Sequence, residues 1–320
     1  MATHGTSRLL YGLSISVCDQ KDSSAGEIIR PPGTDVLWLR RMLASDPGGE
    51  HTVLAETRGD GIWIRHRFAS GNRCCLFDVS PDGRVVISSA LPSMEQANIE
   101  ELFSETVMRT VLCQLGLVSF HAAALALHDR SILLMGSKGA GKSTFAAALQ
   151  QHGWVLMADD LVRLRIRNGL WEAVPGMRRT KLRMDSMHAL GYQASHARPR
   201  WSGDLSREAA GALLDEKLLF GTADTITTEG VPIRGIFALQ PRGPSTAALS
   251  AIELSVPEKI RSLAQHLTAD PLGRHQATAP DAGAAMSGLL TQSAIVKLVV
   301  PDNLSALSRS AATLESLLTA

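Results

Sequence analysis

The order of apolar and polar positions predicts a β-rich N-terminal region that ends in a helix. Between about residues 52 and 89, short alternating runs such as GIWIRHRF and RCCLFDV are separated by turn signals at 59–61 and 81–83, which is the pattern of an antiparallel meander. Residues 92–116 then place apolar side chains at helical spacing and finish at a glycine. We therefore predict a β-rich (α+β) accessory region over residues 1–115.

The remaining residues, 116–320, alternate strand-like and helix-like segments. Two apolar runs at 117–127 and 131–136 predict a β-hairpin. A helix follows at 142–153, and WVLMADDLVRLRI at 154–166 predicts the next strand. Further strands are expected at 231–241 and 294–301, and further helices at about 258–266 and 304–318. Strands that alternate with helices around a glycine-rich loop are typical of a layered α/β domain, which is the fold class we predict.

The composition is that of an ordinary globular protein and argues against one class of partner. The 320 residues are 45% hydrophobic and 20% charged, which is enough apolar material for one large domain or two medium ones. Lysine plus arginine number 32 and aspartate plus glutamate 31, so the formal net charge is +1. Proteins that grip nucleic acid through its phosphates usually have a larger basic excess, so nucleic acid is not an expected partner.

The four cysteines, Cys18, Cys74, Cys75 and Cys113, show no metal-binding or redox spacing. Cys74 and Cys75 are neighbours in a strand-like run and point to opposite faces, which disfavours a disulfide between them. Reduced thiols in a cytoplasmic protein are the simplest interpretation. The apolar stretch at 9–17 is too short to span a bilayer, and no convincing signal-cleavage site follows it, so no membrane association is expected.

A glycine-rich stretch, GSKGAGKST, matches the pattern G-x-x-x-x-G-K-[ST] of nucleotide phosphate loops. Glycines let the backbone curl so that consecutive N–H groups point at phosphates, and the helix that begins at about Lys142 adds the positive end of its dipole. The Lys142 ammonium would reach the β- and γ-phosphates, and the Ser143 hydroxyl would bind Mg²⁺. The expected nucleotide-binding residues are Gly136, Ser137, Lys138, Gly139, Ala140, Gly141, Lys142, Ser143 and Thr144.

The alternative is a glycine-rich turn that matches this pattern by accident. The flanks argue against it, because the stretch lies between an apolar strand at 132–135 and an alanine-rich helix. Lys138, inside the loop, either adds a charge near the phosphates or is a solvated side chain.

Two adjacent aspartates, Asp159 and Asp160, follow the apolar run VLMA one helix after the loop. A strand that ends in aspartate brings a carboxylate to the C-terminal edge of a sheet, where the phosphate loop also lies. One carboxylate would bind Mg²⁺, and the other would orient or deprotonate a nucleophile. The alternative is a strand-end pair that only makes a turn, because aspartate often caps turns. These residues alone do not divide the two roles.

His121 lies in the apolar run SFHAAALAL. A histidine in such a run is often a satisfied core residue, but if this run pairs with the strand that enters the loop, the side chain would stand near the γ-phosphate.

Basic residues cluster twice further on. The arginines of RLRIRN at 163–168 fall on one strand face, which predicts a solvated face. The stretch PGMRRTKLR at 175–183 either holds an acidic substrate or a nucleotide phosphate or, the interpretation we adopt, forms a charged surface loop.

Taken together, these motifs resemble the catalytic core of the HPr kinase/phosphorylase family. That family shows a histidine in a short strand, a strand that enters the phosphate loop, one helix and a strand that ends in Ala-Asp-Asp, as residues 119–164 do here. The downstream VPGMRRTKLRM is similar to a proline-containing, arginine-rich stretch of the shortened relatives. The resemblance covers about 117–183 well and the rest of the chain to Ala320 loosely.

This resemblance implies a P-loop kinase domain of HPr kinase type over residues 116–320, with ATP and Mg²⁺ as cofactors. It implies that Lys142 and Ser143 bind phosphate and metal, that Asp159 is the base toward a serine hydroxyl, and that Asp160 and His121 support it. Asp160 would join Ser143 as a metal ligand.

The chain also departs from the family. It has Thr144 where the family typically carries an acidic residue, and it shows no convincing copy of the glycine-rich signature associated with the phosphorylase reaction. The resemblance therefore implies the forward kinase reaction and does not assign the reverse one.

The function we predict is Mg²⁺-ATP-dependent transfer of the γ-phosphoryl group to a serine of a peptide or small protein. Shortened relatives with a β-rich N-terminal region include lasso-peptide tailoring kinases, so a ribosomally made precursor peptide is the leading acceptor. The alternatives are a nucleotide-sensing regulatory protein that binds ATP without transfer, and a small-molecule kinase. Missing LSGGQ-like and NKxD-type motifs disfavour a transport ATPase and a GTPase. A homo-oligomer stays open.

Overall fold

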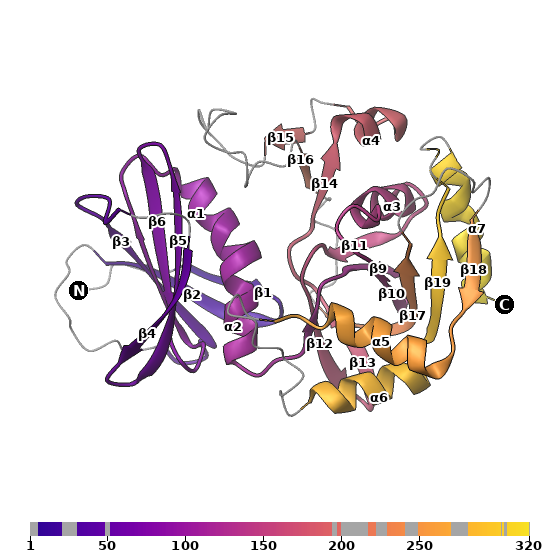
Figure 1. The fold of residues 1–320 in the computed structure, drawn as a ribbon, viewed down its shortest axis with the longest axis horizontal. Coiled ribbons are helices and arrows are strands. Elements are labelled where there is room, and N and C mark those ends of the chain that lie inside the picture. Colours follow the sequence, from indigo (N-terminus) through magenta and orange to yellow (C-terminus); the bar gives the residue numbers. More distant parts are fainter. Residues whose placement is uncertain are drawn as a thin grey trace. The chain divides into compact units, whose positions relative to one another are not determined.

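The computed structural model describes residues 6–20, 31–48, 52–193, 197–199, 217–221, 229–240, 249–269, 281–301, 303 and 306–319. The chain divides into two compact units, the first made mainly of residues up to Leu117 and the second mainly of residues from Val118 onward. Both units contain sheets and helices, so the chain is a mixed α/β protein (Figure 1). In the described residues, no helix has both the length and the apolar character that crossing a membrane requires.

The first unit contains a seven-stranded sheet within the described residues. Its strands are β1 (Thr6–Leu10), β2 (Leu13–Asp19), β3 (Val36–Met42), β4 (Thr52–Arg58), β5 (Gly61–Ser70), β6 (Arg73–Val79) and β7 (Val85–Ala90). They follow the order β1-β2-β3-β7-β6-β5-β4. The antiparallel meander predicted from the sequence is confirmed for β4 to β7. Strand β3 lies parallel to both β2 and β7, an arrangement that local alternation does not reveal.

The helical segment after this sheet packs against the first unit. It consists of α1 (Gln96–Leu102), a π-helical turn at Phe103–Val107 and α2 (Met108–Gln114). The rings of Trp38 and Phe103 stack with centroids 4.0 Å apart, and both side chains are fully buried. The helical segment therefore supplies one wall of the first unit's core.

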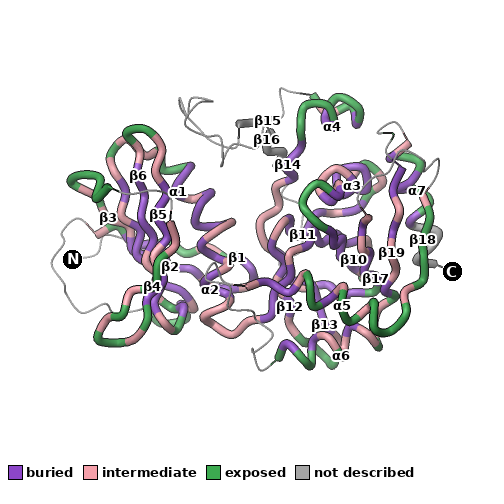
Figure 2. The backbone as a smooth tube through the Cα atoms, viewed as in Figure 1, coloured by how far each residue is buried: buried purple, intermediate pink, exposed green. Residues whose placement is uncertain are grey.

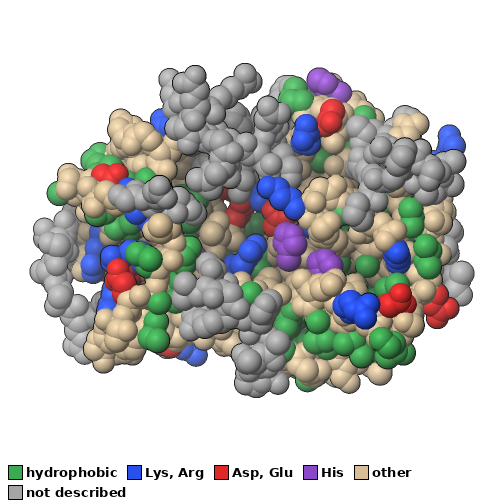
Figure 3. Space-filling model, viewed as in Figure 1, with side chains coloured by type: hydrophobic (Ala, Val, Ile, Leu, Met, Phe, Trp, Pro, Cys, Tyr) green, Lys and Arg blue, Asp and Glu red, His purple; other side chains and the backbone are tan. Residues whose placement is uncertain are grey.

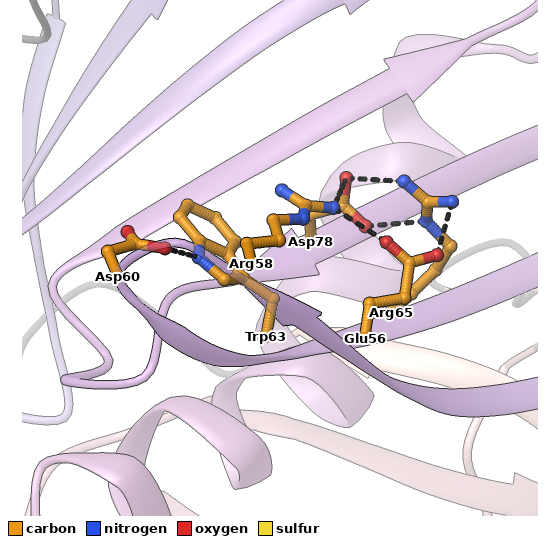
Figure 4. Close-up of polar contacts among 6 residues, drawn as sticks. All are labelled: Glu56, Arg58, Asp60, Trp63, Arg65 and Asp78. Carbon is orange, nitrogen blue, oxygen red and sulfur yellow. Dashed lines mark hydrogen bonds and ion pairs between the residues drawn. The ribbon is translucent and has the colours of Figure 1, made fainter.

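Charged side chains on β4, β5 and β6 form a cluster on one face of this sheet (Figure 4). Arg65 binds Asp78 through two hydrogen bonds of 2.7 and 2.9 Å, and Arg58 lies 3.0 Å from both Asp78 and Glu56. The Arg58 guanidinium also lies 4.5 Å from the centre of the Trp63 ring. Because these charges compensate one another, the cluster stabilises the sheet face without leaving a strong net charge on it.

The second unit is built on a nine-stranded sheet among the described residues. Its strands are β8 (Ser119–Phe120), β9 (Ala123–Leu127), β10 (Arg130–Met135), β11 (Val155–Ala158), β12 (Val162–Arg167), β13 (Leu170–Val174), β17 (Val231–Leu239), β18 (Ser250–Glu253) and β19 (Ala294–Val299). The order is β11-β9-β10-β17-β13-β12-β8, and β19 joins β17 and β18. Strands β10, β17 and β19 are parallel neighbours, and β9 and β10 form the predicted hairpin.

Helices cover both faces of this sheet (Figures 1 and 2). They are α3 (Lys142–Gln150), α4 (Met184–Ala189), α5 (Val256–His266), α6 (Ala282–Gln292) and α7 (Leu307–Thr319). Ile132 and Leu134 of β10 pack in the core with α3 and α7, whereas Leu133 and Met135 pack in the core with α5 and α6. Burial on both faces explains why residues 132–135 of β10 are all apolar and do not alternate. Neither α4 nor α6 was expected from the sequence.

Two strand predictions in this unit are wrong, and both errors fall at polar residues. Residues 154–166 form two strands, β11 and β12, because the chain turns at Asp159 and Asp160, where Asp160 has a φ of +67°. Strand β11 pairs with β9, whereas β12 pairs with β8 and β13. Likewise His121 lies in the bend between β8 and β9, not within a strand. Each break lets the chain cross from one part of the sheet to another.

The predicted charged surface loop at 175–183 is also wrong. Residues 179–183 form strand β14 (Arg179–Arg183) of a small sheet with β15 (Ala197–Pro199) and β16 (Lys217–Gly221). Thr180, Lys181 and Leu182 are buried, and Gln150 of α3 donates a hydrogen bond of 2.9 Å to the Thr180 hydroxyl. Packing against α3 therefore holds part of this basic stretch in a buried strand.

Candidate active site

The glycine-rich stretch forms a tight loop between the end of β10 and the start of α3. Gly136, Gly139 and Gly141 all have positive φ, at +154°, +87° and +93°. A side chain at Gly136 would place its Cβ 2.9 Å from the Leu239 carbonyl oxygen, so the neighbouring strand excludes any other residue there. Both predicted flanks, strand and helix, are present. Such a loop can turn consecutive N–H groups toward an anion.

Lys142 holds its ammonium group inside the loop. Its side chain is nearly buried, and Nζ donates hydrogen bonds to the carbonyl oxygens of Gly136 at 2.7 Å and Ser137 at 3.4 Å. Nζ also lies 3.2 Å from Nε2 of His121. This places the charged end of Lys142 at the beginning of the loop, next to the C-terminal end of β10.

His121 connects Lys142 with the paired aspartates. An ammonium group can only donate, so Nε2 of His121 accepts from Lys142 and the ring proton is on Nδ1. Nδ1–H then donates to the Asp160 carbonyl oxygen at 2.9 Å. The backbone N–H of His121 donates to the His266 carbonyl oxygen at 2.7 Å. The imidazole is therefore fixed in one tautomer and one orientation between Lys142 and Asp160.

Asp159 presents a buried carboxylate with one unsatisfied oxygen. It is 5% exposed, and Oδ1 accepts a hydrogen bond of 3.0 Å from the Asp160 N–H. Oδ2 is buried and has no hydrogen-bond partner among the described residues. Burial, and next the charge of Asp160, raises the pKa of Asp159 to about 7, although Lys181 and a hydrogen bond from Ser143 oppose the shift.

Asp160, unlike Asp159, is held in its ionised state by Lys181, which the sequence did not single out. Lys181 Nζ donates to Asp160 Oδ2 at 2.6 Å, and only 8% of the Lys181 side chain is exposed. Burial alone would raise the pKa of Asp160, but the charge and hydrogen bond of Lys181 outweigh it and hold this pKa well below its ordinary value. The adjacent aspartates therefore differ in protonation, which is how two carboxyl groups take two roles.

The structure brings together His121, Lys142, Ser143, Asp159 and Asp160, all expected from the sequence. Two other members of the loop point elsewhere. Lys138 is exposed, and the Thr144 hydroxyl donates to Ser186 Oγ of α4 at 3.4 Å.

Lys181 is the site residue that sequence reasoning missed. Its signals were the basic stretch at 175–183, interpreted as a surface loop, and the alternation of Thr180 and Leu182 with charged residues in RTKLR, which is too short to distinguish a strand from a loop. The arginines at 163–167 are partly or fully exposed, as the predicted solvated face requires, and Arg165 also forms an ion pair through Nε with Glu172 Oε2 at 3.0 Å.

The donor chemistry of this site fits Mg²⁺. The described residues contain no group of three or more His, Cys, Asp or Glu side chains arranged to hold a metal. Mg²⁺ does not need such a group, since it usually takes one or two carboxylates and completes its shell with phosphates and waters. The buried, unpartnered Oδ2 of Asp159 shows that a hard oxygen donor is present beside Ser143 and Asp160.

The fold and the site define a mixed α/β protein with a glycine-rich loop, a buried lysine and paired aspartates at one sheet edge. No family model matches the chain. Its sequence is 28% identical over 124 residues to the HPr kinase/phosphorylase of Lachnoclostridium phytofermentans, a match that covers 36% of this chain and 40% of that protein. The relationship to HPr kinase/phosphorylase predicted from the motifs is confirmed by this match.

The match is partial, because the chain spans about 40% of the length of the curated relative. Among solved structures, the Hpr(Ser) kinase/phosphatase from Coxiella burnetii is 14% identical, and the alignment covers 63% of this chain and 92% of that one with a TM-score of 0.27.

Proposed function

We propose that this protein is a Mg²⁺-ATP-dependent kinase that transfers the γ-phosphoryl group to a serine of a peptide or small protein. The relationship to HPr kinase/phosphorylase supports the reaction class. The residues expected to act are Lys142, His121, Asp159 and Asp160, and Lys181 joins them as a positioning residue. Residues 1–115 are proposed to be an accessory region and residues 116–320 the catalytic one.

The observation that carries this proposal is the state of Asp159. Its carboxylate is buried beside the loop, and one of its oxygens has no partner in the described part of the chain. Leaving a buried polar atom unpaired costs roughly 1–3 kcal/mol. A kinase needs an acceptor for the serine proton at this place, and the unpaired oxygen of Asp159 can serve as that acceptor.

The proposed step is an in-line displacement at the γ-phosphorus. A bond forms between the serine Oγ and phosphorus, the bond between phosphorus and the β,γ-bridging oxygen breaks, the hydroxyl proton passes to Asp159, and ADP leaves. Lys142 stabilises negative charge on the phosphates from inside the loop, and His121 positions the lysine through the 3.2 Å contact. The raised pKa of Asp159, about 7, is suited to a base near neutral pH.

Ser143 and Asp160 are the residues that would hold Mg²⁺ in this proposal. When bound, the ion would neutralise phosphate charge and help to orient the nucleotide. Lys181 keeps the Asp160 carboxylate ionised, and the 2.6 Å contact of its Nζ with Oδ2 fixes the orientation of that carboxylate. The carboxylate is therefore ready to accept a cation or the water shell of a cation.

The acceptor that we favour is a ribosomally made precursor peptide of the lasso type, by analogy with shortened relatives of the family. HPr itself is the less favoured acceptor, because the chain departs from the family at Thr144 and in the glycine-rich signature. Both carry a serine, so the chemistry of the site is the same for either.

Intact-mass measurement of acceptors after incubation with the protein and Mg²⁺-ATP tests the proposal. The panel contains a lasso-type precursor peptide, HPr and a serine-free peptide. We expect a gain of about 80 Da, one phosphoryl group, on a serine-containing acceptor. The gain should be lost with Lys142→Ala and retained with Lys259→Ala, a matched lysine on α5. ATP binding without transfer to any acceptor would instead favour a nucleotide-sensing protein.

A further inference from the structure

A cavity of about 230 Å³ opens beside the first residues of the glycine-rich loop. One wall is a face of α5, and the opposite wall is formed by the C-terminal end of β17 and by Lys297 of β19. We call it the α5 cleft; its lining includes Gly136, Ser137, Glu258, Arg261, His266 and Lys297. On the face drawn in Figure 3, histidine, basic and acidic side chains lie close together over α5.

The cleft side of α5 is polar because it does not face the core. Glu258, Arg261, Ser262 and Gln265 lie three or four residues apart and form one stripe that lines the cavity. Leu263, on another side of the helix, is fully buried in the core with α6. Because this polar stripe of α5 lines the cavity and does not pack in the core, its side chains are open to a ligand.

The position of Lys142 shows which end of a nucleotide would face this cleft. A loop lysine reaches the β- and γ-phosphates, and its ammonium lies 2.7 Å from the Gly136 carbonyl oxygen and 3.4 Å from that of Ser137. Both of these residues line the cleft. The cleft therefore adjoins the terminal phosphate, where the acceptor must approach. Thr144, at the other end of the loop, instead contacts α4.

The charges of the cleft favour an acidic ligand. Arg261 and Lys297 line it together with one carboxylate, that of Glu258. Glu258 is already used in the cap of α5, where Oε2 accepts hydrogen bonds from the Ser255 N–H at 2.9 Å and from its hydroxyl at 2.6 Å. The Glu258 carboxylate also interacts electrostatically with Arg261 and Lys297, so these three side chains leave one net positive charge to face a ligand. A cavity smaller than the roughly 300–1,000 Å³ of drug-sized sites suits one or two side chains of a peptide.

We propose that the α5 cleft binds an acidic side chain of the acceptor, close in sequence to the serine, through Arg261 and Lys297. This inference rests on the proposed kinase function and adds a determinant of acceptor choice. The backbone hydrogen bond of 2.7 Å between His121 and His266 connects the cleft wall directly with the candidate catalytic residues.

The test uses pools of synthetic serine peptides in which one position flanking the serine is fixed as Glu, Lys or Ala. With the full-length protein and Mg²⁺-ATP, we expect kcat/KM to be about tenfold higher for a Glu pool than for the matching Lys pool, the effect of one charge-assisted contact. Arg261→Glu should reverse the preference toward the Lys pool and leave the KM for ATP unchanged. Lys259→Glu, on the same helix but outside the cleft, should keep the wild-type preference.

Lys297→Glu is a second variant on a different element and should shift the preference in the same direction, so a folding defect of one variant does not decide the result. Equal transfer to Glu, Lys and Ala pools by the wild-type protein would overturn the cleft proposal while leaving the kinase proposal intact. An unchanged acidic preference in both variants would overturn it as well. Transfer to no pool would refute the proposed kinase function, and the cleft proposal with it.

Discussion

Replacing Asp159 with asparagine removes a buried carboxylate while keeping its shape. The side chain is 5% exposed, and Oδ2 has no hydrogen-bond partner among the described residues. The asparagine carbonyl can still accept the hydrogen bond from the Asp160 N–H. The substitution therefore separates the charge of this position from its packing.

The magnitude follows from the pKa of Asp159, which burial raises from 3.8 to about 7. A difference of about three pKa units corresponds to about 4 kcal/mol between the two protonation states. The folded state binds the proton more tightly than the unfolded state does. The tighter proton binding by Asp159 thus contributes to the free energy of unfolding of the wild-type protein in full below pH 4, and this contribution is lost as the pH rises through 7.

The asparagine of the Asp159→Asn variant does not titrate, so the difference in unfolding free energy, variant minus wild type, should increase between pH 4 and pH 7 by as much as about 4 kcal/mol and level off above. The newly unpaired amide group costs roughly 1–3 kcal/mol at every pH, so the variant becomes the more stable protein once the pH passes a value between about 4.5 and 6. Asp160, whose pKa is lowered, titrates below this window.

The measurement is urea unfolding at a series of pH values, read by hydrogen exchange in peptides from residues 118–193 so that the second unit alone is scored. The same variant should bind ATP yet lose transfer by about 10²–10⁴, the usual contribution of a general base. A stability difference that does not change between pH 4 and pH 7 would refute the desolvation argument. Near-normal transfer would assign the base elsewhere.

Two further substitutions test the supporting contacts. Lys181→Ala should lower the free energy of unfolding by about 1–3 kcal/mol, less than a fully buried pair because 35% of the Asp160 side chain is exposed. Arg183→Ala, at an exposed position of the same strand, should cost much less in the same urea titration, and equal losses would contradict the assigned pair. Gly136→Ala should reduce the melting temperature and ATP binding more than Gly139→Ala, because the new Cβ would lie 2.9 Å from a backbone oxygen at 136 and meets nothing within 4 Å at 139. Similar losses at both would show that strain in φ, about 1–2 kcal/mol per residue, is the only cost.

The positions of the breaks in the strands matter for the chemistry. The chain turns at His121 and again at Asp159 and Asp160, and these polar residues meet at one edge of the sheet. An unbroken strand would have sent alternate side chains to opposite faces. The turn at Asp160 brings its carbonyl oxygen to His121 while its carboxylate faces Lys181.

The sequence by itself determined the glycine-rich loop, its two flanks and the adjacent aspartates. These features are local: the backbone freedom of glycine, an apolar strand and an alanine-rich helix act between neighbours in the chain. The meander of the first unit was predictable for the same reason, since alternation and turn residues specify hairpins locally.

Only the tertiary structure decided which side chains complete the site. His121 meets Lys142 across 21 residues and Asp160 across 39, and Lys181 meets Asp160 across 21. The α5 cleft joins residues from Gly136 to Lys297. No local pattern distinguishes a buried lysine on a five-residue strand from a solvated one in a loop, because burial depends on which elements pack over it. Strand register and helix packing supply that information, and they exist only once the chain has folded.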